Sequence, residues 1–179
     1  MRWLWIDRFV EFESGRRAKA IKTVSLTEKY IDEYFMGFPV MTPSFCIEGF
    51  AQMGGLLISQ QSDFRINLVL AKVSRSRIHR LARPGDQLVY ETIIQALHPD
   101  GGLVSGTSHI NGELHIEAEL TFAQVSRERF PQDFFEPVEL LRMLRIFGMF
   151  HVGVDADGKP LEVPAHLLEA ERRDAGGQN

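Results

Sequence analysis

One segment, residues 34–60, limits the possible folds of this chain more than any other. A turn rich in glycine and proline, from Tyr34 to Thr42, runs directly into a predicted helix that ends near Gln60. Thr42 followed by Pro43 is typical of a helix start, because threonine caps free amides and proline fits the first turn. Apolar residues occupy every side of this helix, so we expect it to be buried all round at the centre of the fold.

Glu48 is the only charged residue of that helix, and Ser44 and Gln52 are the other strongly polar ones between residues 43 and 58. An unpaired carboxylate among apolar side chains has a raised pKa, because burial disfavours the ion. Glu48 is therefore a candidate site residue. A structural role is the alternative, since Glu48 and Gln52 are one helical turn apart and can satisfy each other. The residues alone leave both interpretations open.

Strand-like segments on both sides of this helix predict an antiparallel sheet. Alternating aromatic and β-branched residues predict strands at residues 3–13 and 18–24, joined by a turn at 14–16. Three further strand-like stretches cover residues 66–73, 87–97 and 103–110, and Asn111-Gly112 predicts a tight hairpin that continues to residue 125. A sheet curled around one apolar helix is the most economical arrangement, which makes the fold class α+β.

The chain changes character after Arg127. Val138, Leu141, Leu144 and Phe147 recur at helical spacing and predict an amphipathic helix at about residues 136–149. Residues 169–179 are mostly polar, and we expect them to be frayed. The sequence thus predicts a domain at residues 1–125 and a C-terminal extension at residues 126–179.

Composition excludes several classes of protein. The chain of 179 residues is long enough for one domain with a real core. Its net charge of −4 gives no basic bias toward nucleic acid. No apolar run approaches a membrane span, and Asp7 and Arg8 interrupt the apolar N-terminal stretch. The single cysteine, Cys46, fits a reducing compartment, so we expect a cytoplasmic protein.

The sequence also lacks the patterns of several common binding sites. No pair of histidines has the spacing and the second ligand of a zinc site. There is no glycine-rich phosphate loop and no Gly-x-Ser-x-Gly motif. We therefore expect no metal and no cofactor.

Several short motifs follow one another along residues 4–125: Ile6-Asp7-Arg8, Ala20-Ile21-Lys22, Phe35-x-Gly37-x-Pro39-Val40-Met41, Ile47-Glu48-x-x-Ala51-Gln52, Pro84-Gly85-Asp86, and Asn111-Gly112 with Glu117-Ala118-Glu119-Leu120. In this order they resemble the (3R)-hydroxyacyl-acyl-carrier-protein dehydratases of fatty acid synthesis. Those enzymes have the hot-dog fold, an antiparallel sheet wrapped around a central buried helix. The resemblance implies the same fold here, with the C-terminal extension lying outside it.

In the family that this chain resembles, a histidine and a carboxylate from opposite protomers of a dimer face a tunnel for the acyl-phosphopantetheine arm. The histidine removes the proton alpha to the thioester carbonyl, and the carboxylate helps the 3-hydroxyl to leave as water. The resemblance implies that the carboxylate is Glu48. The histidine, which opens the family's His-Phe-x-Gly motif, is replaced by Tyr34. A phenol with an unperturbed pKa of about 10 is a poor base at neutral pH.

The resemblance also bears on how the thioester oxygen is stabilised. After Val-Met the family has Pro-Gly, whose glycine amide faces that oxygen, whereas this chain has Thr42 and Pro43. Proline has no N–H, so one donor is absent, although the Ser44 amide remains. The substrate-binding residues that the resemblance implies are Gly37, Phe38, Pro39, Val40, Met41, Ser44 and Gln52.

The stretch from residue 75 to residue 83 is locally basic in an acidic chain. Its arginines are Arg75, Arg77, Arg80 and Arg83. They form either a solvated strand face or a docking surface for an acidic carrier protein. Such a surface would speed association and be sensitive to salt.

These observations support three hypotheses about function. The first is a dehydratase-like protein that binds 3-hydroxyacyl thioesters of acyl carrier protein or another carrier, at a tunnel in a dimer interface. The second is a non-catalytic subunit or binding module that lends Glu48 to a histidine-containing relative. The third is an acyl thioesterase, in which Glu48 activates water. The resemblance implies a homodimer or a hexamer, and the second hypothesis a heterodimer.

Overall fold

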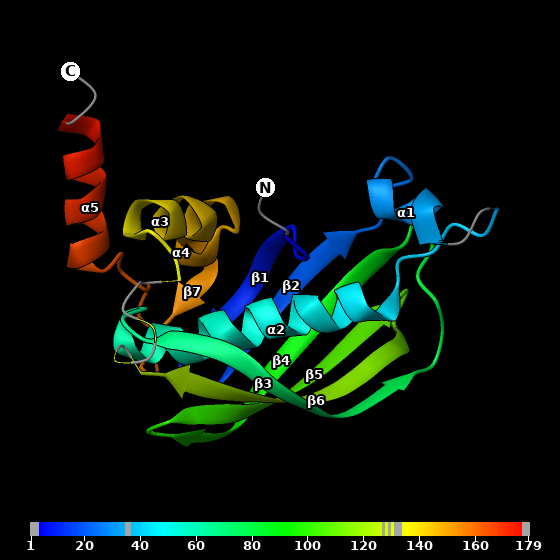
Figure 1. Cartoon of the computed structure of the whole chain (residues 1–179), viewed down its shortest axis with the longest axis horizontal. Helices are drawn as coiled ribbons and strands as arrows, with labels where there is room; N and C mark the ends of the chain where they lie inside the picture. Colours follow the sequence, from blue (N-terminus) through cyan, green and yellow to red (C-terminus); the bar gives the residue numbers. More distant parts are fainter. Residues whose placement is uncertain (1–3, 35–36, 127, 129, 131–133, 177–179) are drawn as a thin grey trace.

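A computed structural model describes the chain at residues 4–34, 37–126, 128, 130 and 134–176, with residues 32–34 described for the backbone only. Within these residues seven strands form one sheet in the order β3-β6-β5-β4-β2-β1-β7 (Figure 1). The strands are β1 (Arg8–Glu13), β2 (Arg17–Thr23), β3 (Asn67–Ile78), β4 (Gln87–His98), β5 (Gly101–Ile110), β6 (Glu113–Val125) and β7 (Gly153–Val154). The helices are α1 (Lys29–Tyr34), α2 (Pro43–Ser59), η1 (Gln60–Ser62), α3 (Pro137–Ile146), α4 (Met149–Val152) and α5 (Ala165–Gly176).

Neighbouring strands from β3 to β1 pair antiparallel, as the sequence predicts. Asn111 and Gly112 join β5 to β6 with φ values of 53° and 81°, which is the left-handed geometry that a two-residue hairpin requires. At the far edge β7 pairs parallel with β1, with Phe12 opposite Gly153. The sheet is therefore mixed, because a two-residue strand from the C-terminal extension joins it.

Helix α2 lies across the concave side of the curled sheet (Figure 1). Two of its glycines allow close approach, since a Cβ at Gly49 would lie 3.1 Å from the Tyr90 ring and one at Gly54 would lie 3.0 Å from the Phe122 ring. Cys46, Phe50 and Leu57 are among its fully buried residues. This arrangement confirms the expected α+β hot-dog fold.

One face of α2 is not fully buried, although we expected the helix to be buried on all sides. Ser44 and Glu48 are exposed, and Gln52, Gly55 and Ser59 are only partly buried. These positions follow one another at helical spacing on one face. The prediction of a helix buried all round was therefore wrong for this face, which is the one that carries the polar residues.

The residues after β6 pack onto the same hydrophobic core. Leu141, Leu144 and Phe147 are fully buried in it. Helix α3 is shorter than the predicted 136–149, because Gly148 follows it with φ 65° and donates its N–H to the Arg145 carbonyl, 2.9 Å away. Helices α3 and α4 lie alongside the C-terminal half of α2, and α5 lies farther out at that end (Figure 1).

Helix α5 occupies most of the tail that we expected to be frayed. Leu167 anchors it in the core. The Arg142 guanidinium of α3 donates to Asp174 Oδ2 at 2.8 Å, and the Arg145 guanidinium donates to Glu171 Oε2 at 3.0 Å. Water screens exposed pairs of this kind, so the apolar anchor matters at least as much.

Candidate functional site

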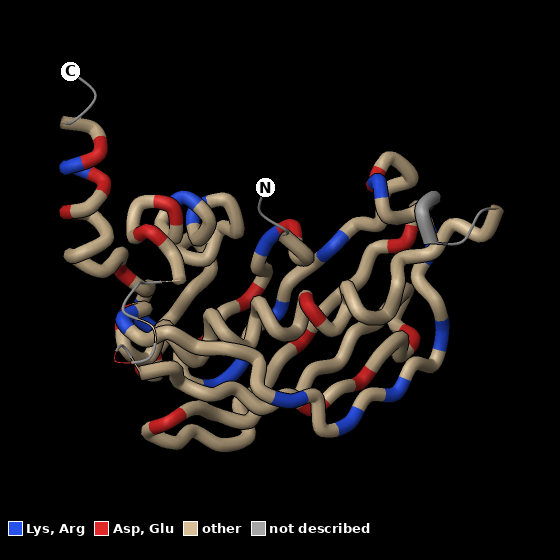
Figure 2. Tube along the Cα trace, in the orientation of Figure 1, with Lys and Arg blue, Asp and Glu red and all other residues tan. Residues whose placement is uncertain are grey.

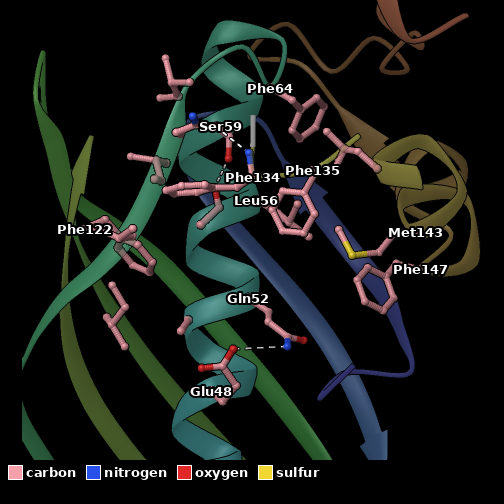
Figure 3. Close-up of a pocket in the computed structure, with 18 of the residues that line it drawn as sticks. Glu48, Gln52, Leu56, Ser59, Phe64, Phe122, Phe134, Phe135, Met143 and Phe147 are labelled. Atoms are coloured by element: carbon pink, nitrogen blue, oxygen red, sulfur yellow. Dashed lines mark hydrogen bonds between the residues drawn. The ribbon is translucent and has the colours of Figure 1, made fainter. Parts of the chain in front are cut away.

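A cavity of about 540 Å³ lies along the partly exposed face of α2 (Figure 3). Its walls are mostly apolar, and its size lies within the range of roughly 300–1,000 Å³ for small-molecule sites. The lining residues come from five parts of the chain: Leu4; Glu48, Ala51, Gln52, Gly55, Leu56 and Ser59 of α2; Phe64, Ile66 and residues 67–70 of the turn and β3; Phe122 of β6; and Phe134, Phe135, Leu140, Met143 and Phe147 of the C-terminal extension.

Glu48 and Gln52 lie at one end of this cavity and are joined by a hydrogen bond (Figure 3). The Gln52 Nε2 donates to Glu48 Oε1 at 3.4 Å. The Gln52 Oε1 accepts the backbone N–H of Trp5 at 2.9 Å. Because that oxygen is engaged by a donor, the amide nitrogen is the end that faces the carboxylate. Gln52 thereby orients Glu48.

The apolar surroundings raise the pKa of the Glu48 carboxyl above its ordinary value, because they disfavour the ion. The hydrogen bond from Gln52 lowers this pKa and so offsets part of the effect. The sequence predicted the direction of this shift. A carboxyl that holds its proton to higher pH can donate that proton to a leaving hydroxyl.

Aromatic rings fix the first turn of α2 against the rest of the fold. Pro43 is its first residue, as predicted, although Thr42 makes no side-chain capping bond. The Phe45 ring stacks on Trp5 at 4.1 Å and meets Tyr30 edge-on at 4.7 Å. Since Trp5 also donates to Gln52, one residue of the N-terminal segment helps to position both the helix start and the acid.

The other predicted substrate-binding residues lie outside the cavity. Val40 and Met41 are buried, and the Met41 N–H donates to the Ala82 carbonyl at 2.9 Å. Phe38 is 44% exposed, and the Arg83 guanidinium lies 5.2 Å from its ring centre. Gly37 and Pro39 flank Phe38, and Ser44 is exposed with its Oγ donating to Thr42 Oγ1 at 3.3 Å.

Of the predicted site residues that the structure describes, Glu48 and Gln52 line the cavity. The other predicted substrate-binding residues form or precede the first turn of α2, on the side of Glu48 away from the long apolar part of the cavity. Tyr34 ends α1, and its side chain lies outside the described part of the structure.

Sequence reasoning missed the opposite end of the cavity. Phe64, Phe134 and Phe135 supply bulky walls there, and Met143 and Phe147, also missed, line the side of the cavity beside Gln52 and Leu56 (Figure 3). One signal in the sequence was available, since three phenylalanines occur within the otherwise polar residues 126–136.

The predicted basic stretch follows the outer edge of the sheet along β3 and beyond it (Figure 2). Arg77 lies 3.8 Å from Glu117, and Arg80 lies 2.6 Å from Glu113. Arg75 is opposite Glu119 in the strand register. Acidic residues of β6 therefore offset part of the positive charge.

Among the described residues no cluster of three histidine, cysteine or acidic side chains could hold a metal ion. Across the same residues no helix has the length and apolar character needed to cross a membrane.

Comparison with known sequences gives a match to one family. Residues 1–124 match the model of the FabA-like domain. The chain is 37% identical over 122 residues to the 3-hydroxyacyl-[acyl-carrier-protein] dehydratase FabZ of Pelotomaculum thermopropionicum, an alignment that covers 68% of this chain and 87% of that protein. It is 34% identical over 123 residues to FabZ of Bacillus subtilis, with 68% and 86% covered.

Solved structures resemble the chain in fold. The dehydratase heterocomplex ApeI:P of Xenorhabdus doucetiae matches with a TM-score of 0.59 and 15% identity over 79% of this chain and 89% of that one. Smu.793 of Streptococcus mutans, bound to acetyl CoA, matches with a TM-score of 0.57 and 15% identity over 70% and 94%. At 15% identity these two matches concern the fold alone.

Proposed function

The chain belongs to the FabA-like domain family, and on that premise we propose that it binds 3-hydroxyacyl thioesters beside Glu48. It is a dehydratase-like protein of fatty acid biosynthesis. The observation that carries the proposal is the position of Glu48, a carboxyl with a raised pKa at one end of an apolar cavity of about 540 Å³. An acyl tail fits such walls, and a 3-hydroxyl fits beside such an acid.

Glu48 acts as the acid of dehydration in this proposal. Its proton passes to the 3-hydroxyl oxygen as the carbon–oxygen bond breaks, and water leaves. A base takes the proton from the alpha carbon, whose electron pair forms the new double bond. Gln52 is a positioning residue, because it holds Glu48 through the hydrogen bond of 3.4 Å.

The base is the part of this reaction that the chain's own residues fit least well. The resemblance of residues 34–37 to the His-Phe-x-Gly motif implies that Tyr34 replaces the family's histidine, and Pro43 has no N–H to offer at the helix start. Both substitutions favour a second candidate function, in which a histidine-containing relative pairs with this chain and Glu48 completes a shared site.

We further propose a dimer formed through β3. This strand ends the sheet and has one unpaired edge, and Leu70, Val73 and Ile78 on it are exposed.

The preferred carrier is acyl carrier protein, which would dock on Arg75, Arg77, Arg80 and Arg83. We also propose that residues 1–125 form the hot-dog unit and that residues 126–179 are an addition to it.

The test measures hydration of 2-enoyl thioesters and dehydration of 3-hydroxyacyl thioesters by enoyl absorbance, with free thiol followed in parallel. The purified chain is assayed alone and mixed with a histidine-containing FabZ protein. The variants are Glu48→Gln and Tyr34→His. Loss of the acid should lower the rate by roughly 10²–10⁴-fold without abolishing thioester binding.

The outcomes separate the candidates. Activity of the chain alone that is lost in Glu48→Gln supports a self-sufficient dehydratase. Glu48-dependent activity that needs the FabZ protein, or that appears with Tyr34→His, supports the shared site. Release of free thiol identifies a thioesterase, and failure to bind any acyl thioester overturns the proposal.

A further inference from the structure

We propose that the C-terminal extension walls the acyl-binding cavity along α3 and at its far end, and so sets the longest acyl tail that the cavity accepts. This inference rests on the proposed function, because it names the substrate class of the same cavity. Three observations carry it: the length of the cavity along α2, the rigidity of the α3 wall, and a glycine that leaves the middle of the cavity open.

The length of the cavity suits an extended alkyl tail. The residues of α2 that line it run from Glu48 to Ser59, a rise of about 16 Å at 1.5 Å per residue. An extended alkyl chain advances roughly 1.3 Å per carbon, given carbon–carbon bonds of about 1.5 Å. With the hydroxyl-bearing carbon at the acid, the α2 wall therefore matches about twelve further carbons, that is, a 3-hydroxyacyl group of about fourteen to fifteen carbons.

Helix α3 closes the side of the cavity beyond Gln52 (Figure 3). Leu140, Met143 and Phe147 line the cavity and belong to the hydrophobic core at the same time. The Phe147 ring meets Phe9 edge-on at 6.0 Å, and the Phe147 carbonyl accepts the Phe9 N–H at 2.8 Å. Because β1 holds this wall by backbone and ring contacts, a longer tail cannot simply displace it.

The turn after α2 contributes a second part of the far wall. Phe64 has a φ of 61°, which is strained for a bulky residue, and its side chain lines the cavity. Backbone strain of this kind often accompanies ligand sites. On the neighbouring strand the Asn67 Oδ1 accepts the N–H of Phe134 at 3.2 Å, which ties the extension to the start of β3.

Gly55 keeps the middle of the cavity open. A Cβ at this position would have one near neighbour, the Phe122 ring at 3.7 Å, which is an ordinary contact. Glycine inside a helix costs about 1 kcal/mol relative to alanine, so nothing in helix formation favours it here. A larger side chain at residue 55 would instead project into the path from Glu48 to Ser59.

The experiment compares binding of hydrolysis-resistant 3-hydroxyacyl-pantetheine amides with butanoyl, tetradecanoyl and octadecanoyl tails by calorimetry. Wild type should bind the tetradecanoyl compound most tightly. Gly55→Leu should weaken tetradecanoyl binding by on the order of tenfold or more, the loss of two or three buried methylene groups, and should change butanoyl binding by about twofold at most. Gly55→Ala is the graded control.

A second pair of variants tests the extension itself. Met143→Ala should shift the preference toward the octadecanoyl compound by about tenfold, because it makes room in the wall for additional carbons. Leu144→Ala is the matched control, since Leu144 is the next residue, is also buried and is not among the residues that line the cavity. It should lower stability by a similar amount and leave the length preference unchanged.

Two results would overturn the inference in different ways. If wild type binds all three compounds and neither Gly55→Leu nor Met143→Ala alters its length preference, the extension is not part of the site and the proposed function stands. If wild type binds none of the compounds, the proposed function is wrong together with the inference.

Discussion

At the scale of single residues, Glu48 belongs to a short chain of hydrogen bonds that starts at the backbone of Trp5. The Trp5 N–H fixes the Gln52 amide, and that amide fixes the acid. Apolar walls raise the pKa of Glu48 while Gln52 lowers it. The chemistry at this site therefore depends on a balance between two neighbouring side chains.

Replacing Gln52 should shift the pH dependence of the reaction. Dehydration needs protonated Glu48, so its rate falls as pH rises through the pKa of that carboxyl. Gln52 stabilises the ionised form, so Gln52→Leu should raise the pKa and move this falling limb to higher pH. The measurement is kcat/KM against pH, and a merely structural residue would lower the rate at every pH without moving the limb.

His115 should make the fold sensitive to acid. It is buried, its Nδ1 lies 3.1 Å from Ser108 Oγ, and burial lowers its pKa from 6.5 to about 4. The unfolded chain therefore binds one more proton between about pH 6.5 and pH 4, so stability present above this window is lost as pH falls through it.

The variant His115→Gln removes this titration. Its melting temperature should change less between pH 7 and pH 4 than that of wild type, by several degrees in thermal unfolding. An equal loss of stability in both proteins over that range would show that another group titrates.

At the scale of elements, the clearest contrast lies between two adjacent glycines of α2. Gly54 faces the sheet, where a Cβ would lie 3.0 Å from the Phe122 ring and 3.4 Å from Val104. Gly55 faces the cavity, where the nearest atom would be 3.7 Å away. One glycine permits packing and the other leaves space for a ligand.

Alanine at these two positions should have opposite effects on stability. Gly54→Ala should destabilise the chain by about 1–3 kcal/mol, because it overpacks the contact with the sheet. Gly55→Ala should be neutral or stabilising by up to about 1 kcal/mol, because alanine favours the helix. Urea unfolding at equilibrium measures both, and equal effects of the two substitutions would contradict the assigned faces.

The secondary structure was largely predictable from the sequence where the signal is local. Thr42-Pro43 marked the start of α2, and Asn111-Gly112 marked the turn between β5 and β6. Helix α5 was missed because its sequence is polar and its order depends on Leu167 and on ion pairs with α3. Such tertiary contacts leave no periodic pattern in the sequence.

At the scale of the whole molecule, the cavity combines segments that are far apart in the sequence. Leu4, α2, the start of β3 and α3 meet only after the sheet has curled and the extension has folded back. The acid and its raised pKa could be predicted from the apolar helix around Glu48. The far wall could not, because no local pattern shows which residues α3 will face.

Charge on the edge strand should control the encounter with an acidic carrier. Reversing Arg75 and Arg77 to glutamate should slow association with acyl carrier protein by about tenfold or more at low salt, with the difference shrinking as salt screens the charges. The matched control is Arg173→Glu on α5, which changes an exposed charge far along the chain. The association rates are measured by stopped flow. An equal decrease in the association rate for all these variants would contradict the proposed docking surface.

The most direct measurement is a crystal structure of the chain with a 3-hydroxytetradecanoyl-pantetheine amide bound. The account predicts that the 3-hydroxyl lies within hydrogen-bonding distance of the Glu48 carboxyl and that the tail runs along Gly55, past Met143, toward Ser59. A ligand bound elsewhere, or a tail that leaves the α2 groove before reaching α3, would contradict it.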